Sequence, residues 1–136
     1  MKIIITETPS KTIDGYMILP VVHGAVKLDN VPRNACEEIV VDNCLDNVKD
    51  KTIISKLNDK IRKGGNLNIY GKDINILCQE LLNKNITAED FESYTVSKKT
   101  LWSTDRLCNE LKNLGLKITH SQIKGYSYEV RASRSK

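Results

Sequence analysis

The chain has 136 residues, of which 40% are apolar and 28% charged, and its formal net charge is +4. This length and composition are typical of a single globular domain with a hydrophobic core. The modest excess of positive charge does not by itself predict nucleic-acid binding. No apolar run approaches the ~18 residues of a membrane-spanning helix, and no secretory signal is visible, so we expect a cytoplasmic protein that binds no membrane.

Cysteine and histidine are spaced too widely to indicate a metal centre. The four cysteines form no C-x-x-C pair, and neither histidine stands near one of them. We therefore expect no structural zinc and no metal-binding residues. The cysteines are expected to be reduced and mainly to fill the core. They are Cys36, Cys44, Cys78 and Cys108.

The first 42 residues contain four short runs that are typical of strands. Residues 2–6 are rich in β-branched side chains, and residues 15–20 form a second apolar run that begins and ends with turn residues. Residues 24–28 are a third candidate, and residues 38–42 are the clearest of the four.

The middle of the chain predicts a helix followed by a fifth strand. Apolar residues recur at helical spacing from Ile53 to Ile61, with Thr52 available as the N-cap. Arg62 and Lys63 would then occupy the last turn, and the pair at 64–65, Gly-Gly, would end the helix. Residues 67–70 are predicted to form the strand that follows.

The last half predicts three helices and a hairpin. One helix begins near Asp73, a capping-box pattern at residues 87–90 starts a short second one, and residues 103–114 form an amphipathic third that ends at Gly115. Residues 116–123 and 126–132 alternate apolar and polar side chains on either side of a glycine-containing turn. This pattern predicts a terminal antiparallel hairpin.

Three segments stand out together: EEIVVDNCLDNV at 37–48, RKGGNLNI at 62–69, and the closing LGLKI with GYSYEV. They resemble the class I S-adenosylmethionine-dependent methyltransferases, and in particular their compact bacterial and phage forms with a shortened first half. The resemblance implies one domain over residues 1–136, built on a Rossmann-like open α/β sheet with a C-terminal antiparallel hairpin.

The resemblance also implies where a cofactor would bind. The family's glycine turn after the first strand corresponds to Thr6, Glu7 and Thr8, followed by Pro9, and the acid that binds the ribose corresponds to Leu19 and Pro20. Asp29 matches the third-strand acid, and Asn43 and Asp46 follow the fourth strand. A remnant cleft formed by Thr6, Glu7, Thr8, Asp29, Asn43 and Asp46 is therefore predicted, without catalytic residues.

Because glycines let a backbone approach a ligand closely, their replacement predicts loss of ordinary S-adenosylmethionine binding. We expect a non-catalytic, methyltransferase-like domain that acts as a binding or structural protein, for example in phage assembly or as part of a virion. Its expected partner is another protein or a second copy of the chain. No bound cofactor is expected.

Two alternatives remain open at this point. In the first, the chain is an active methyltransferase that holds S-adenosylmethionine in an atypical way, with Glu7, Asp29 and Asp46 as polar contacts and Tyr70 near the acceptor. In the second, residues 73–134 form a winged-helix DNA-binding module, with residues 103–114 as the recognition helix. The exposed positions of that helix mix acids with bases, so it offers phosphates no net positive charge.

Overall fold

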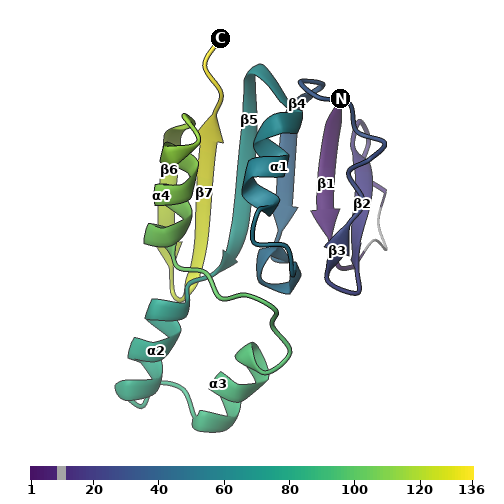
Figure 1. Cartoon of the computed structure of the whole chain (residues 1–136). Helices are drawn as coiled ribbons and strands as arrows, with labels where there is room; N and C mark the ends of the chain where they lie inside the picture. Colours follow the sequence, from purple (N-terminus) through teal and green to yellow (C-terminus); the bar gives the residue numbers. More distant parts are fainter. Residues whose placement is uncertain (9–11) are drawn as a thin grey trace.

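The computed structural model describes residues 1–8 and 12–136, so Pro9 lies outside the described residues. The first half contains strands β1 to β4, a short 3-10 helix η1, and helix α1 (Figure 1). Their bounds are β1 Lys2–Thr6, β2 Met17–Val22, β3 Ala25–Val26, β4 Cys36–Asp42, η1 Leu45–Asn47 and α1 Ile53–Lys60. The second half contains β5 Ile61–Lys72, α2 Ile74–Leu82, α3 Ala88–Thr95, α4 Thr104–Asn113, β6 Lys117–Lys124 and β7 Ser127–Ser133.

The seven strands form one sheet in the order β3-β2-β1-β4-β5-β7-β6. Strands β2, β1, β4 and β5 are parallel, while β7 runs antiparallel to β5 and β6 antiparallel to β7. The expected open α/β sheet with a C-terminal antiparallel hairpin is confirmed. Strand β2 is added on one side of β1, and β4 and the later strands are added on the other side. Such a topological switch point is where open α/β sheets usually bind ligands.

Two predicted elements differ from the structure. The third strand is only Ala25–Val26, and it runs antiparallel to β2 because the chain reverses at His23 and Gly24, which both have positive φ. Helix α1 ends at Lys60, so Gly64 and Gly65 do not terminate it but belong to β5.

Packing between two strands explains the glycine at position 65. A Cβ atom placed there would lie 2.8 Å from the carbonyl oxygen of Cys36 and 2.7 Å from the side chain of Ile61. Gly65 is therefore at a site of close strand approach, where a side chain does not fit.

The three later helices begin where the sequence predicts. Asp73, Thr87 and Ser103 are their N-caps, and Thr87 and Asp90 form the expected capping box. The winged-helix alternative is wrong in its architecture, because β7 pairs with β5 from Asn66↔Ser133 to Lys72↔Ser127. The hairpin is therefore part of the central sheet rather than a separate wing.

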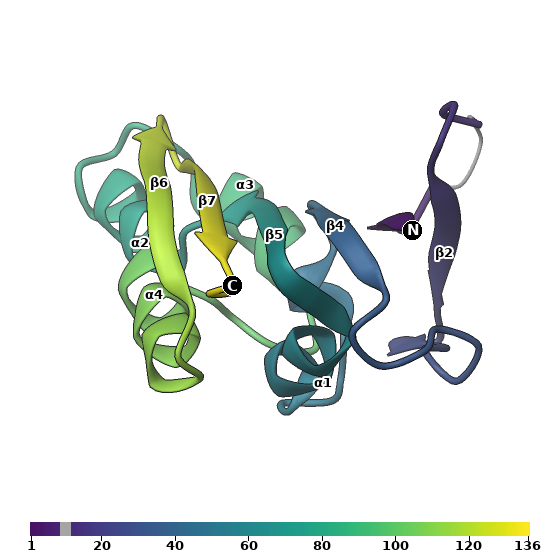
Figure 2. The ribbon, with the colours of Figure 1, turned by 90° about the horizontal axis from the view of Figure 1, so that it is seen from above.

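The hydrophobic core lies on one face of the sheet. Helices α1 and α4 cover this face, and viewed from above both lie on the same side of the strands (Figure 2). Helices α2 and α3 instead lie beyond the carboxyl ends of the parallel strands (Figure 1). Buried side chains of the core include Ile3, Ile5, Ile39, Val41, Leu57, Leu67, Ile69, Trp102, Leu107, Leu111 and Val130.

No helix among the described residues covers the opposite face, which we call the open face (Figure 2). One row of side chains crosses it in register, from β2 to β6. The row contains Ile18, Ile4, Val40, Asn68, Arg131 and His120. It is apolar over β2, β1 and β4 and polar over β5, β7 and β6.

Within the described part of the chain, no helix has the length and apolar character that a membrane span requires. The same residues contain no group of three or more histidine, cysteine, aspartate or glutamate side chains that could hold a metal ion.

Candidate functional site

Five of the six predicted site residues follow two adjacent strand ends at the carboxyl edge of the sheet. Thr6 at the end of β1 pairs with Asp42 at the end of β4, so the residues that follow these two strands start side by side. Glu7 and Thr8 continue from β1, and Asn43 and Asp46 continue from β4. We call this group, together with Asp42 and Cys44, the carboxyl-edge cluster.

The end of β1 is held by a side chain rather than by a glycine turn. Thr6 is buried, and its Oγ1 accepts a hydrogen bond of 3.3 Å from the backbone N–H of Thr8. Glu7 and Thr8 are exposed. A threonine hydroxyl in this role stabilises a local turn, so Thr6 has a structural function whether or not a ligand binds here.

The end of β4 turns sharply at Asn43. This residue has a φ of 52°, its N–H donates to the carbonyl of Tyr70 at 3.0 Å, and its Nδ2 donates to Asp42 Oδ1 at 3.1 Å. Asparagine tolerates the left-handed region better than most residues, which explains why it stands at this turn.

Cys44 lies beneath this turn and is fully buried. Its Sγ donates to the carbonyl of Ile5 at 3.3 Å. Burial, with smaller contributions from Glu7, Asp42 and Asp46, raises the pKa of the thiol to about 12. The thiolate, which is the nucleophilic form, is therefore almost absent near neutral pH, and Cys44 is not placed to act as a nucleophile.

Asp46 is a half-buried acid of the cluster that lies next to a lysine. Its burial raises the pKa of the carboxyl group, and the nearby Lys98 opposes that shift. Lys98 Nζ lies 3.6 Å from Asp46 Oδ1, an oxygen that has no hydrogen-bond partner. Behind it, burial raises the pKa of the Tyr128 hydroxyl, with Asp46, Asp73 and Cys44 adding to the shift.

A segment that the sequence did not single out covers this edge. Residues 96–102, which we call the strap, run from α3 towards α4 and bind the carbonyl groups around η1. The N–H groups of Lys99 and Thr100 donate to the Asp46 carbonyl at 2.8 and 3.0 Å, and Thr100 Oγ1 donates to the Leu45 carbonyl at 3.3 Å. Trp102 Nε1 in turn donates to Thr100 Oγ1 at 2.9 Å.

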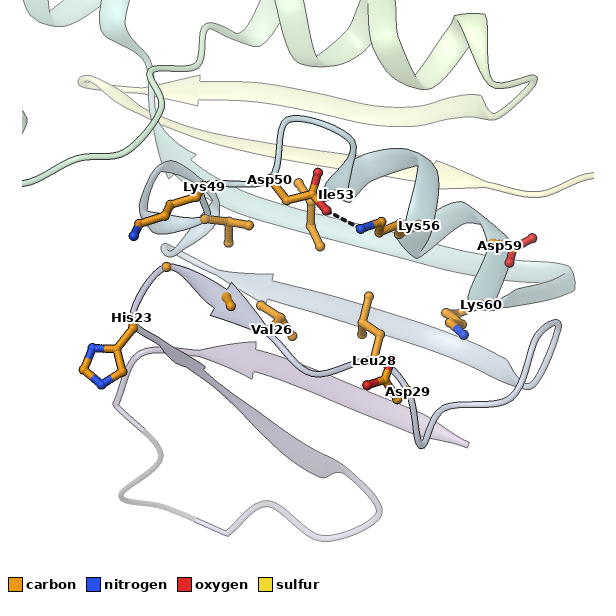
Figure 3. A pocket seen from close by; sticks show the side chains of 13 residues that line it. His23, Val26, Leu28, Asp29, Lys49, Asp50, Ile53, Lys56, Asp59 and Lys60 are labelled. Atoms are coloured by element: carbon orange, nitrogen blue, oxygen red, sulfur yellow. Dashed lines mark hydrogen bonds and ion pairs between the residues drawn. The ribbon is translucent and has the colours of Figure 1, made fainter.

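The sixth predicted residue, Asp29, lies elsewhere. Because β3 is antiparallel to β2, the chain returns towards the amino ends of β1 and β4 before it reaches Asp29. Asp29 lines a groove of about 560 Å³ between the β3 region and α1 (Figure 3). His23, Leu28, Lys49, Ile53 and Lys60 also line it, and an ion pair between Lys56 and Asp50 crosses part of its wall.

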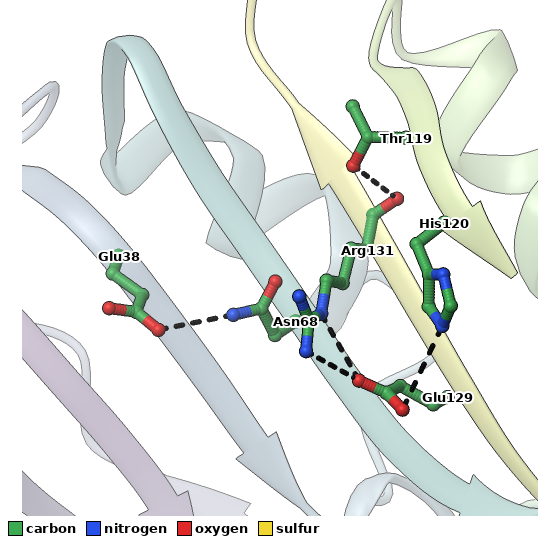
Figure 4. Close-up of polar contacts among 6 residues, drawn as sticks. All are labelled: Glu38, Asn68, Thr119, His120, Glu129 and Arg131. Atoms are coloured by element: carbon green, nitrogen blue, oxygen red, sulfur yellow. Dashed lines mark hydrogen bonds and ion pairs between the residues drawn. The ribbon is translucent and has the colours of Figure 1, made fainter.

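A second polar arrangement occupies the open face (Figure 4). On β4, the carboxylate of Glu38 accepts two hydrogen bonds, one from Tyr16 Oη at 2.6 Å and one from Asn68 Nδ2 at 3.1 Å. On β7, Arg131 donates twice to Glu129, at 3.1 and 2.8 Å, and His120 lies 3.8 Å from the other oxygen of the same carboxylate. In the sequence, this face could have been identified only from polar side chains at alternate positions of successive strands, which the strand register places in one row.

Solved structures of similar fold include S-adenosylmethionine-dependent methyltransferases. One from Aquifex aeolicus shares 12% identity with a TM-score of 0.59, over 97% of this chain and 81% of that one. One from Mesorhizobium loti shares 9% identity with a TM-score of 0.62, over 98% and 90%. A methyltransferase in the Haloferax volcanii complex with the Trm112 methyltransferase activator shares 8% identity with a TM-score of 0.65, over 99% and 83%.

At these identities the likeness shows the fold, which is the Rossmann-like methyltransferase fold, and does not transfer an activity. No protein-family model matches the sequence, and no curated protein matches it.

Proposed function

We propose that this chain is a methyltransferase-like domain that works by binding another protein, and that it does not use S-adenosylmethionine. The observation that carries the proposal is the open face. Four parallel strands have their second face without a covering helix among the described residues, whereas parallel sheets are almost always covered on both faces.

The side chains of the open face support this interpretation. Strands β1 and β4 contain the apolar runs III and IVV, and such short continuous runs are typical of strands buried on both sides. Ile18 and Val40, which are half-buried, and Ile4, which is buried between them, provide the apolar part of the face. A partner that covered these residues would complete the second layer of the domain.

The carboxyl-edge cluster supports the absence of the cofactor. S-adenosylmethionine carries a carboxylate, and in this fold the turn after β1 would have to accept it. That turn here carries Glu7, Asp42 is the last residue of the adjacent β4, and Asp46 follows four residues later. All three contribute to the raised pKa of the Cys44 thiol. A ligand carboxylate would meet like charges, and the described residues therefore do not fit the cofactor.

The end of β2 supports the same conclusion. A carboxylate at this position would accept hydrogen bonds from the ribose of a nucleoside. The strand instead ends with proline and valines, and Pro20 pairs with Thr6 of β1. The strap also satisfies the carbonyl groups of η1, so these groups are already bonded without a ligand.

Isothermal titration with S-adenosylmethionine and with S-adenosylhomocysteine tests the cofactor part of the proposal. We expect no binding by either compound at micromolar concentrations, and a dissociation constant in the micromolar range, about −8 kcal/mol, would overturn it. Incubation with a radiolabelled methyl donor and a cell lysate is the matching activity test, and transfer of label would support the active methyltransferase instead.

A protein partner is consistent with one solved neighbour, since the Haloferax volcanii methyltransferase is seen with an activator protein. Placement in the cytoplasm and a role in phage assembly or in a virion remain predictions. DNA binding is not proposed, because α4 packs Leu107 and Leu111 into the core and presents mixed charges outward.

A further inference from the structure

Helix α2 is more apolar than its burial explains. Its sequence is INILCQELL, yet Leu77 is its only buried residue. Ile74, Cys78 and Leu82 are spaced four residues apart and therefore share one side of the helix. Cys78 is exposed, and Leu82 is 81% exposed. A helix that is apolar on two sides is normally buried on both, which indicates that this side meets a partner.

The helical part of the chain also differs in charge from the rest. Residues 73–97, which we call the helical lobe, contain five acidic residues and one basic residue. The remaining residues contain 12 acidic and 20 basic ones. The lobe therefore has a net charge of −4 and the remainder +8. The lobe of one molecule is attracted by the sheet-bearing part of another.

The open face has the complementary chemistry. Ile4, Ile18 and Val40 lie next to one another across β2, β1 and β4, and Arg131 lies in the same row on β7. Lys2 precedes Ile4 by two residues on the same strand and reaches over the ring of Tyr16, at 5.6 Å from its centre. The aliphatic side chains provide the local fit for an apolar helix. Arg131 pairs with Glu129 and Lys2 with Glu37, so the attraction for the acidic lobe comes from the net charge of the sheet-bearing part as a whole.

We propose that a second copy of this chain occupies the open face, and that α2 of one copy packs there on the sheet of the next. This inference rests on the proposed function, which makes the open face a binding surface. Within one molecule the contact cannot form, because α2 lies beyond the carboxyl ends of the strands rather than over their faces (Figure 1). The proposed contact is head to tail: each copy gives its lobe to one neighbour and its open face to another, which generates rings or filaments. The same two surfaces paired reciprocally about a two-fold axis would instead stop at a dimer.

Charge disfavours one symmetric alternative. Pairing of two lobes would bring two net charges of −4 together. Pairing of two open faces is the other symmetric arrangement, but it leaves Leu82 and Cys78 in water. The contact between lobe and open face covers both apolar surfaces at once.

Sedimentation velocity of the full chain over a range of concentrations and salt tests the proposal. We expect concentration-dependent assembly beyond a dimer that weakens as salt is raised, because opposite charges across the contact are screened. Leu82→Asp should weaken assembly by roughly 10- to 100-fold, since it removes a buried leucine from the contact. Leu101→Asp is the matched control: this leucine is also exposed but lies on the strap, and assembly should not change.

A variant of the open face completes the design. Arg131→Glu alters an exposed side chain of the row and should also prevent assembly, whereas Arg33→Glu, which alters an exposed arginine paired with Asp59 of α1, should not. The decisive sample mixes Leu82→Asp with Arg131→Glu. One intact lobe and one intact open face remain in that mixture, so a 1:1 complex is expected from two variants that are each monomeric. Circular dichroism of each variant checks that it is folded.

Three outcomes would overturn the proposal: a folded chain that stays monomeric at all concentrations, assembly that survives Leu82→Asp, or a mixture that fails to form the 1:1 complex. If the mixture forms no 1:1 complex, and the unmodified chain forms a dimer that only Arg131→Glu abolishes, the result would indicate that two open faces pair with each other. Binding of S-adenosylmethionine by a chain that still assembles would overturn the absence of the cofactor and leave the assembly intact.

Discussion

Asp73 and Thr104 are joined by two hydrogen bonds that link the start of α2 to the start of α4. Asp73 Oδ2 accepts from the N–H of Thr104 at 2.9 Å and from its hydroxyl at 2.7 Å. Asp73 Oδ1 accepts from the N–H groups of Asn75 and Ile76 at 2.9 and 3.2 Å. One buried carboxylate therefore caps α2 and also binds the first N–H group of α4, and it fixes the lobe to the helix that covers the core.

Replacement of this carboxylate should be costly. Asp73→Asn keeps one acceptor oxygen but presents an NH₂ group to donors on the other side. We expect it to lower the free energy of unfolding by about 1–3 kcal/mol, measured by urea denaturation. Asp105→Asn, an exposed acid in the first turn of α4, is the control and should change stability by less than about 1 kcal/mol.

The same carboxylate should make stability depend on pH. Burial opposes the charged form of Asp73, but hydrogen bonds from Thr104, Ile76 and Asn75 outweigh it and lower the pKa. Its contribution is therefore complete above the unfolded-state pKa, about pH 3.9, and is lost as the pH falls through the lower folded-state value. The stability difference between wild type and Asp73→Asn should shrink as urea unfolding is moved from neutral to strongly acidic pH. A constant difference would contradict this assignment.

Thiol reactivity should separate the cysteines. Cys78 is exposed, whereas Cys44 is buried with a pKa raised to about 12. A disulfide reagent at mildly alkaline pH, added to the chain at a dilution where it is monomeric, should modify Cys78 rapidly and Cys44 only when the chain is unfolded by denaturant. Cys78→Ser should remove the rapid phase. Fast labelling of Cys44 in the native chain would show that the end of β4 opens readily.

Gly71 should not tolerate a side chain. A Cβ atom there would lie 2.5 Å from the hydroxyl oxygen of Tyr128, which is buried in the core. Gly71→Ala should therefore lower the thermal midpoint and cost about 1–3 kcal/mol of stability through overpacking. Gly15→Ala meets no atom within 4 Å and is limited by its φ of +83°, so it serves to separate steric crowding from backbone strain.

Thr100 should hold the strap on the carboxyl edge. Thr100→Val removes the donor to Leu45 and the acceptor for Trp102 Nε1 and should cost about 1–3 kcal/mol. Because Trp102 is the only tryptophan, its fluorescence should shift to longer wavelength if the strap loosens. Thr119→Val, which removes an exposed hydroxyl on β6, should leave the spectrum unchanged.

Local chemistry explains which elements were predictable. The N-caps Asp73, Thr87 and Ser103 act within a few residues, so their side chains identified the helix starts correctly. The strand β3 and the Gly-Gly pair were misread because their conformation depends on distant partners: β3 on a reversal against β2, and Gly65 on the approach of Cys36.

The candidate site was predictable only in part, for the same reason. The register of β1 with β4 brings the strand ends together, as the order of elements implies. The strap has no periodic pattern, and its role rests on backbone hydrogen bonds to residues about 50 positions earlier. Such contacts leave little trace in a single sequence.

The pairing of β5 has a consequence for how the chain folds. Ile69 pairs on one side with Val41, which is made earlier, and on the other with Val130, close to the C-terminus. During synthesis one edge of this long strand stays unpaired until nearly the whole chain has emerged. Closure of the sheet therefore awaits a contact of high sequence separation, which makes folding slow and places the period of greatest aggregation risk just before translation ends.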